Sequence, residues 1–190
     1  MDNNSKSRQE AFDEISKHIE TQRNYIVMMC GCAGSGKTTF AQRLVDQLGC
    51  IRFSIDEEIW QTHGRYGIEY QECQYDQLKK DTEDILKQRL EDLLSKGNLF
   101  AVLDYSFWNV NTRKQYIDLI EKYHHNYQIV YLNVSHSELR KRLEIRSNRF
   151  DANAAFKISD QLLEQYLSGF NRPNINDNMN VWIINNRDFN

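Results

Sequence analysis

The sequence of 190 residues contains a single proline, Pro173, and only eight glycines. It has no hydrophobic run approaching the roughly 18 residues that a membrane-spanning helix needs. Residues 1–10 are polar and do not resemble a secretion signal. Linkers rich in proline or serine, internal repeats and low-complexity tracts are also absent from the sequence. We therefore expect a soluble, cytoplasmic globular protein with no membrane partner.

Cysteine and net charge are also low. The four cysteines include no C-x-x-C pair, and we expect all four to be reduced. The net charge is −3, so the chain as a whole has no electrostatic attraction to nucleic acid or anionic membranes. Nucleic acid is therefore a partner that the composition does not favour, although a local basic stripe would allow it.

The most informative motif is a complete phosphate-binding loop, G-x-x-x-x-G-K-T, at residues 31–38. An apolar run at 25–30 precedes it and predicts a buried strand. Residues 37–48 follow it with apolar side chains at helical spacing. This strand–loop–helix context distinguishes a true P-loop from a chance match. The sequence therefore predicts that a nucleoside triphosphate binds here.

Each residue type in this loop has a chemical reason. Main-chain N–H groups must converge on a phosphate chain, so the loop needs glycines in place of bulky side chains. Lys37 supplies positive charge to the β- and γ-phosphates, and the Thr38 hydroxyl can ligate Mg²⁺. Thr39 either reaches the α-phosphate or is an ordinary first-turn residue. With ATP and Mg²⁺ as the expected ligands, the predicted nucleotide-binding residues of the loop are Gly31, Ala33, Gly34, Ser35, Gly36, Lys37, Thr38 and Thr39.

Beyond this motif, predicted strands alternate with predicted helices. Such alternation is typical of an α/β fold with a parallel sheet that is covered on both faces. We divide the chain into an N-terminal helical extension, 1–23, and a P-loop domain, 24–190. The strands are expected at 25–30, 51–55, 99–103, 127–132 and 181–184, and the helices at 5–22, 37–48, about 72–95, 112–124, 136–147 and 159–169.

Two aspartates follow predicted strands, at the edge of the sheet where ligands bind in such folds. Asp56 comes after the second strand, where it suits a general base that accepts a proton from a substrate hydroxyl. Its alternative role is the N-cap of a helix beginning at Glu57. Asp104 closes the apolar third strand as in a Walker B motif, and we predict that it binds Mg²⁺ together with Thr38. The alternative is a turn-initiating aspartate.

An arginine-dense predicted helix runs from 139 to 149. Arg142, Arg146 and Arg149 fall within about 60° of one another on it. A run of like charge is usually a solvated face, but such arginines can also neutralise a phosphoryl group during transfer. We assign catalytic roles to Arg142 and Arg146, alongside Lys37 and Asp56, and nucleotide binding also to Arg142. Arg149 remains open, and Arg140 faces elsewhere.

Residues 60–70 connect the second strand to the long helix and contain two glycines, three aromatic residues, a histidine and an arginine. Such a composition favours a mobile loop that binds the phosphoryl acceptor. Alternatively, Trp60 and Tyr66 pack over the core. The segment 105–109 follows Asp104 and is expected to form an opposite wall. The predicted substrate-binding residues are Asp56, Trp60, Arg65, Tyr66 and Trp108.

Taken together, these segments resemble the small P-loop kinases related to polynucleotide 5′-kinase and zeta-type toxins, including proteins described as AAA-family ATPase-like. The resemblance spans roughly residues 24–185. It implies a three-layer, nucleoside-kinase-like P-loop NTPase fold with a five-stranded parallel sheet in the order 2-3-1-4-5. It also implies a lid at about 147–158 and lid arginines at Arg142 and Arg146. The resemblance further implies that Asp56 activates the acceptor and that Asn186 lies near the adenine.

These features favour an ATP-dependent kinase that transfers the γ-phosphate to a hydroxyl of a small-molecule acceptor. Two alternatives remain open. One is a polynucleotide 5′-kinase or a zeta-type nucleotide-sugar kinase toxin, and the other is a slow ATPase that acts as a nucleotide-dependent interaction switch. A ring-forming motor is not expected, because the sequence shows no second-region arginine finger.

Overall fold

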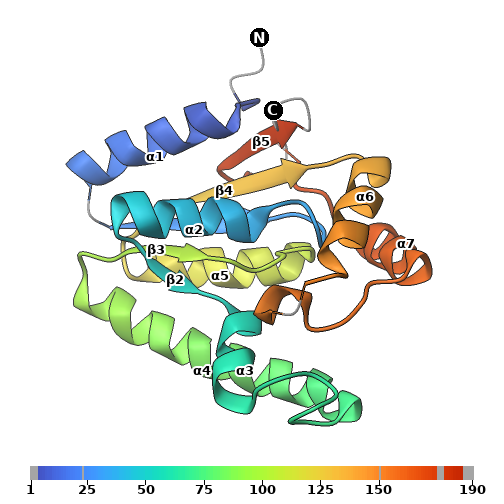
Figure 1. The fold of residues 1–190 in the computed structure, drawn as a ribbon. Helices are drawn as coiled ribbons and strands as arrows, with labels where there is room; N and C mark the ends of the chain where they lie inside the picture. The colour runs from blue at the N-terminus through green and yellow to red at the C-terminus, as the bar shows by residue number, and fades with distance from the viewer. Residues whose placement is uncertain (1–3, 23, 150, 175–177, 186–190) are drawn as a thin grey trace.

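Five strands form one parallel sheet in the order β2-β3-β1-β4-β5. The computed structural model, shown in Figure 1, describes residues 4–22, 24–149, 151–174 and 178–185. The order and the all-parallel pairing confirm the predicted P-loop kinase-like fold. The strands are β1 (Tyr25–Cys30), β2 (Ile51–Phe53), β3 (Phe100–Leu103), β4 (Asn126–Asn133) and β5 (Val181–Asn185).

Helices cover both faces of this sheet. The side chains of β1 alternate between the faces, as the twofold repeat of a strand requires: Val27 packs with one set of helices and Met28 with the other. One layer contains α1 (Arg8–Thr21) and α2 (Lys37–Leu48), and the opposite layer contains α3 (Ile55–His63), α4 (Tyr75–Lys96) and α5 (Val110–Lys122). The short 3₁₀ helices are η1 (Glu72–Gln74) and η2 (Ala152–Ala154).

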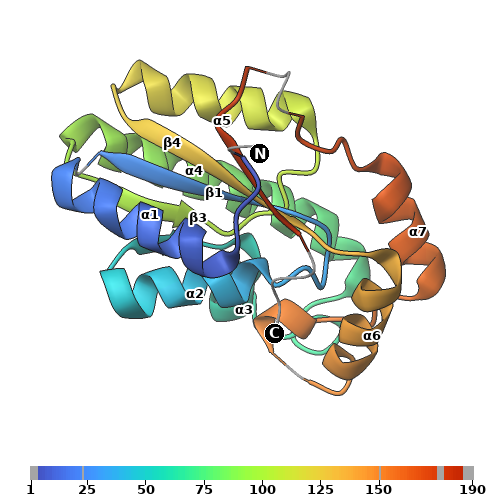
Figure 2. The same ribbon diagram turned by 90° about the horizontal axis from the view of Figure 1, so that it is seen from above.

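The remaining helices, α6 (His136–Arg146) and α7 (Asp160–Gly169), stand beyond the carboxyl ends of the strands, as Figures 1 and 2 show. The P-loop lies at this same end, between β1 and α2. No helix in the described part of the chain combines the length and the hydropathy that crossing a membrane requires.

The connection after β2 differs from the prediction. We expected a loop over 60–70, but α3 extends from Ile55 to His63, so Trp60 is helical. The helix begins because the Ser54 hydroxyl accepts a hydrogen bond from the Glu57 N–H at 3.4 Å. Ser54, not Asp56, is therefore the N-cap residue, and the alternative role for Asp56 was wrong. Residues 64–70 remain outside helices and strands, apart from an isolated bridge between Tyr66 and Tyr70.

The N-terminal segment packs against the rest of the fold. The Ile183 N–H of β5 donates to the Asn4 carbonyl at 2.7 Å, and the Lys6 N–H donates to the Ile183 carbonyl at 3.1 Å. After this strand-like pairing, α1 buries Phe12 and Ile15 in the same hydrophobic cluster as α2 and β5. The helix that we described as an extension thus shares a core with the sheet.

The core between α4 and the sheet supports a stability prediction. Leu90 is fully buried, whereas Ile85 on the same helix is 63% exposed. We expect Leu90→Ala to lower the free energy of unfolding by about 2–5 kcal/mol, because the lost contacts leave a cavity. Ile85→Ala is the matched control and should have little effect. Urea denaturation followed by circular dichroism measures both, and equal effects would contradict the described packing of α4.

Candidate nucleotide-binding and phosphoryl-transfer site

The P-loop main chain adopts conformations that favour glycine. The φ angles of Gly34 and Gly36 are 80° and 95°, in the left-handed region that other residues rarely adopt. A side chain at Gly31 would also lack space, because its Cβ would lie 2.6 Å from the Ser35 Oγ and 3.1 Å from the Leu132 carbonyl oxygen. The three glycines thus place no side chain of their own over the loop at the positions where the sequence predicted a phosphate cradle.

Lys37 folds back over this loop. Its Nζ donates to the carbonyl oxygens of Gly31 and Cys32, each at 3.0 Å. Burial lowers the pKa of Lys37, and Asp104 is the strongest of the acidic groups that oppose this shift. The ammonium group therefore lies close to both the loop and the carboxylate that ends β3.

Asp104 is held by an arginine of the neighbouring strand. Its Oδ2 accepts hydrogen bonds from the Nε and Nη2 of Arg52 at 3.0 and 2.7 Å, and its side chain is 1% exposed. Its Oδ1 is buried and has no hydrogen-bond partner within the described residues. A buried carboxylate oxygen without a partner is unusual in a folded protein. A magnesium ion beside a phosphate chain would be a chemically suitable partner for this oxygen.

Thr38, the other predicted magnesium ligand, donates from its hydroxyl to the Asn153 Oδ1 at 3.2 Å. Asn153 belongs to η2, inside the predicted lid. The described residues contain no group of three or more acidic, histidine or cysteine side chains placed to bind a metal. Mg²⁺ needs only one or two protein carboxylates, because phosphate oxygens and water complete its shell.

A buried arginine holds the segment after Asp104 in place. Arg113 of α5 donates from Nη1 to the carbonyl oxygens of Phe107 and Asn171, both at 2.8 Å. The Gly31 N–H in turn donates to the Ser106 carbonyl at 3.0 Å. These bonds join the strand end that carries Asp104 to the start of the P-loop.

Asp56 lies in the first turn of α3, where its Oδ1 accepts a hydrogen bond from the Tyr75 hydroxyl at 3.4 Å. The side chain is accessible to solvent, yet the surrounding protein removes enough water to raise its pKa. Lys79, Lys37 and Arg146 oppose this rise, whereas Asp104 adds to it. The structure therefore brings the predicted base into electrostatic range of the P-loop lysine, the predicted magnesium ligand Asp104 and Arg146 of α6.

The arginines of the predicted 139–149 helix divide between two environments, and Arg149 lies beyond α6, which ends at Arg146. Arg142 donates from Nη1 to the Ser35 carbonyl of the P-loop at 3.4 Å and from Nε to Glu138 at 2.8 Å. Arg146 has a pKa lowered first by burial, a shift that Asp56 and Asp151 oppose. Arg149, by contrast, is exposed and pairs with Asp151 at 2.6 Å. Arg142 and Arg146 thus face the site, and Arg140 pairs with Asp160 and Glu164 away from it.

The predicted acceptor residues lie in different surroundings. Tyr66 packs with Tyr70, Tyr75 and Phe156, with ring centroids 5.0–6.0 Å apart, and Tyr75 links this aromatic cluster to Asp56. Two of the remaining predicted residues are exposed on the surface. Arg65 is exposed and pairs with Glu69 at 2.5 Å, and Trp108 is 47% exposed beside Gly169. Trp60 is partly buried on α3, and Asn186 lies outside the described residues.

Several residues at this site were not predicted from the sequence. Tyr75 and Lys79 are spaced i, i+4 on α4 and would share a helix face, but nothing in the sequence connects α4 to Asp56. Arg52 within β2 and Asn153 within the lid reach the site through contacts across 52 and 115 residues of chain. Local pattern carries no signal for contacts of that kind.

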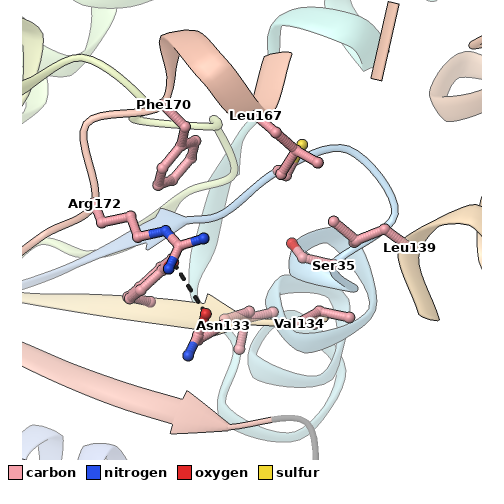
Figure 3. A pocket seen from close by; sticks show the side chains of 10 residues that line it. Ser35, Asn133, Val134, Leu139, Leu167, Phe170 and Arg172 are labelled. Carbon is pink, nitrogen blue, oxygen red and sulfur yellow. Dashed lines mark hydrogen bonds between the residues drawn. The ribbon is translucent and has the colours of Figure 1, made fainter. Parts of the chain in front are cut away.

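A small pocket of about 20 Å³ lies beside the P-loop. Figure 3 shows the Arg172 guanidinium group pointing toward Asn133 at one side of it, with Ser35 at another. Tyr131 also lines it and donates to the Asn133 Oδ1 at 3.2 Å. This volume holds about one water molecule, so the pocket is too small for a nucleotide.

The P-loop, the parallel sheet and the arginines of α6 define a nucleotide-binding, kinase-like protein of the P-loop class. The chain matches the AAA domain family over residues 26–173 and belongs to it. It is also 26% identical over 147 residues to an adenylate kinase isoenzyme 6 homolog from Schizosaccharomyces pombe, covering 76% of this chain and 75% of the relative.

Solved structures show the same fold at lower identity. A putative kinase from Chloroflexus aurantiacus is 15% identical with a TM-score of 0.66, and the match covers 86% of this chain and 89% of that one. A gluconokinase from Sinorhizobium meliloti is 16% identical with a TM-score of 0.56, covering 86% and 83% of the two chains.

Proposed function

We propose that the protein is an Mg·ATP-dependent phosphotransferase whose acceptor is the hydroxyl group of a small molecule. The observation that carries this proposal is the position of Asp56. Its carboxyl lies within electrostatic range of Lys37, Asp104 and Arg146, which come from the P-loop, the end of β3 and α6. A base placed beside the groups that bind the transferred phosphate suits phosphoryl transfer more than nucleotide binding alone.

In this proposal each residue has one role. Asp56 accepts the proton of the acceptor hydroxyl, whose oxygen bonds to the γ-phosphorus while the bond from that phosphorus to the β–γ bridging oxygen breaks and ADP leaves. Lys37, Arg142 and Arg146 hold the phosphate chain and neutralise its charge. Thr38 and Asp104 would bind Mg²⁺, which when bound neutralises charge on the phosphate oxygens.

The lid at about 147–158 belongs to the same proposal. Asn153 of this segment contacts Thr38, and Phe156 packs on Tyr66 and Tyr75. Residues of the lid therefore contact both the nucleotide loop and the aromatic cluster next to Asp56. We propose that closure of this segment excludes water from the transferred phosphate.

A coupled assay that follows ADP release tests the function. Gluconate is one acceptor to test, since a gluconokinase shares the fold. The other acceptors to test are sugars, sugar acids, nucleosides and hydroxylated antibiotics. The proposal expects at least one compound to stimulate ADP release and to appear as its phosphate ester in mass spectrometry. ATP hydrolysis that no compound stimulates would contradict it and would favour the switch hypothesis.

A second acceptor class is a nucleoside monophosphate. The adenylate kinase homolog matches three quarters of this chain at higher identity than the two solved structures reported above. AMP therefore belongs in the same assay, and formation of ADP from AMP and ATP would assign this class. A 5′-hydroxyl oligonucleotide is the last acceptor to test. We expect it not to be phosphorylated, because the chain is net acidic.

The proposal also fixes a pH dependence. Asp56 acts as a base only when ionised, and the partial loss of surrounding water raises its pKa. We therefore expect kcat/KM to rise with pH through a limb that lies above that of an ordinary aspartate. Lys79 is the strongest group lowering that pKa. Lys79→Gln should therefore move the limb to higher pH, whereas the exposed neighbour Lys80, replaced by Gln, should leave it in place. A limb that Lys79→Gln leaves unmoved would contradict this assignment.

A further inference from the structure

Arg8, at the first position of α1, reaches the P-loop from outside the matched family domain. Its Nη2 donates to the Ser35 carbonyl oxygen at 3.3 Å. The same nitrogen also contacts the position that a Cβ on Gly36 would occupy. The family match begins at residue 26, so this contact is a feature of the N-terminal segment of this chain.

Three sets of contacts fix the start of α1 at this place. Asn4 and Lys6 pair with Ile183 of β5 immediately before the helix. The Ser7 hydroxyl then caps the helix by accepting from the Glu10 N–H at 3.1 Å. Further along, Arg43 of α2 lies 3.9 Å from the centre of the Phe12 ring. The first turn of α1 is therefore held at the carboxyl end of the sheet, where α2 also begins (Figures 1 and 2).

Arg8 and Arg142 of α6 contact the same carbonyl oxygen of the P-loop. Arg142 donates from its Nη1 to the same Ser35 carbonyl, at 3.4 Å. Burial, followed by the charge of Arg142, lowers the pKa of Arg8 to about 10. Two guanidinium groups that converge on one carbonyl repel each other, and a phosphate chain in the loop would offset that repulsion.

We propose that Arg8 binds the phosphate chain of the nucleotide, so that the N-terminal helix is part of the nucleotide site. A guanidinium group offers planar, paired donors that match phosphate oxygens, and Gly36 leaves space for it beside the loop. The inference rests on the nucleotide half of the proposed function and not on the acceptor. A purely structural Arg8 would hold the Ser35 carbonyl without responding to the charge of the ligand.

Calorimetric titration of Mg·ATP into the full chain tests this inference. Arg8→Gln should raise the Kd for Mg·ATP by about tenfold or more, as expected for the loss of a charge-assisted hydrogen bond, and should weaken the dependence of binding on salt. Arg8→Lys should recover part of the affinity, because it restores the charge. Lys17→Gln, which removes an exposed positive charge from the same helix, is the matched control and should bind like the wild type.

Affinity of Arg8→Gln within about twofold of the wild type, roughly 0.4 kcal/mol or less, would overturn the inference. Tighter binding would also overturn it, because Arg8 would then occupy the phosphate position. Thermal unfolding shows whether the variant is folded. If it is not, a second experiment on the wild type measures the rate at which phenylglyoxal modifies Arg8, followed by peptide mass spectrometry. Saturating Mg·ATP should slow this modification, and an unchanged rate would overturn the inference.

These outcomes separate the inference from the proposed function. Normal ATP binding by Arg8→Gln, together with a phosphorylated acceptor, overturns only the role of Arg8. Weakened binding without any phosphorylated acceptor supports Arg8 and contradicts only the acceptor half. A wild-type chain that binds no nucleoside triphosphate overturns both.

Discussion

Replacing Asp56 by asparagine is expected to lower turnover by about 10²–10⁴-fold, the range typical of a general base. The change keeps the size of the side chain and removes its ability to accept the proton of the acceptor hydroxyl. Asp56 is on α3, outside the P-loop that grips the phosphates, so the Kd for Mg·ATP should stay close to that of the wild type. Steady-state kinetics with the identified acceptor and calorimetry with Mg·ATP measure the two effects separately.

Glu57→Gln is the matched control for this variant. Glu57 is the next residue in the same first turn and lies 3.8 Å from Arg52, so its replacement also removes one negative charge from the helix start. We expect it to keep most of the activity. Turnover of Asp56→Asn within about tenfold of the wild type would leave less than about 1.4 kcal/mol of transition-state stabilisation to this carboxylate. Such a result would rule out Asp56 as the base.

Replacing Lys37 by alanine is expected to weaken nucleotide binding and turnover together. The ammonium group lies over the loop, 3.0 Å from two of its carbonyl oxygens, and a phosphate chain would give it a stronger partner. Turnover should fall by about 10²–10³-fold, as for removal of one donor that stabilises developing charge. Binding of Mg·ATP should weaken in the same variant.

The exposed Lys80 of α4 provides the control for Lys37, because Lys80→Ala removes the same charge away from the P-loop. We expect it to bind and turn over like the wild type. Circular dichroism should show that Lys37→Ala keeps the fold. A folded Lys37→Ala protein with unchanged affinity for Mg·ATP would show that residues 31–38 do not bind the nucleotide.

The P-loop was predictable from sequence because its function depends on the local main chain. A glycine pattern between a strand and a helix specifies positive φ angles and a helix N-terminus within eight residues. The alternation of apolar runs likewise specified an α/β sheet. The strand order came from the family resemblance, since periodicity alone does not say which strands are neighbours.

The end of β2 shows why the boundaries were less secure. Ile55 continues the apolar run of the strand, but its burial belongs to α3, which starts there because Ser54 caps it. A nine-residue helix with a partly buried tryptophan has too few turns to show a clear period. The prediction of a loop over 60–70 therefore failed for residues 60–63, and Trp60 is a helical residue in any acceptor site.

The acceptor side was harder to predict because its contacts are distant in the chain. Tyr75, Lys79 and Arg8 approach Asp56 or the P-loop only after the helices pack on the sheet. Arg65 was predicted from the composition of the 60–70 segment, and its only local sequence signal is the pair with Glu69 four residues later. Whether it binds the acceptor stays a prediction.

Calorimetric titration of Mg·ATP into the wild-type chain shows whether residues 31–38 bind a nucleotide. It is done at two temperatures, so that a vanishing enthalpy is not mistaken for absent binding. A P-loop kinase should show saturable binding with one nucleotide per chain. The absence of heat at both temperatures, with ATP and with GTP, would show that the P-loop does not bind a nucleoside triphosphate.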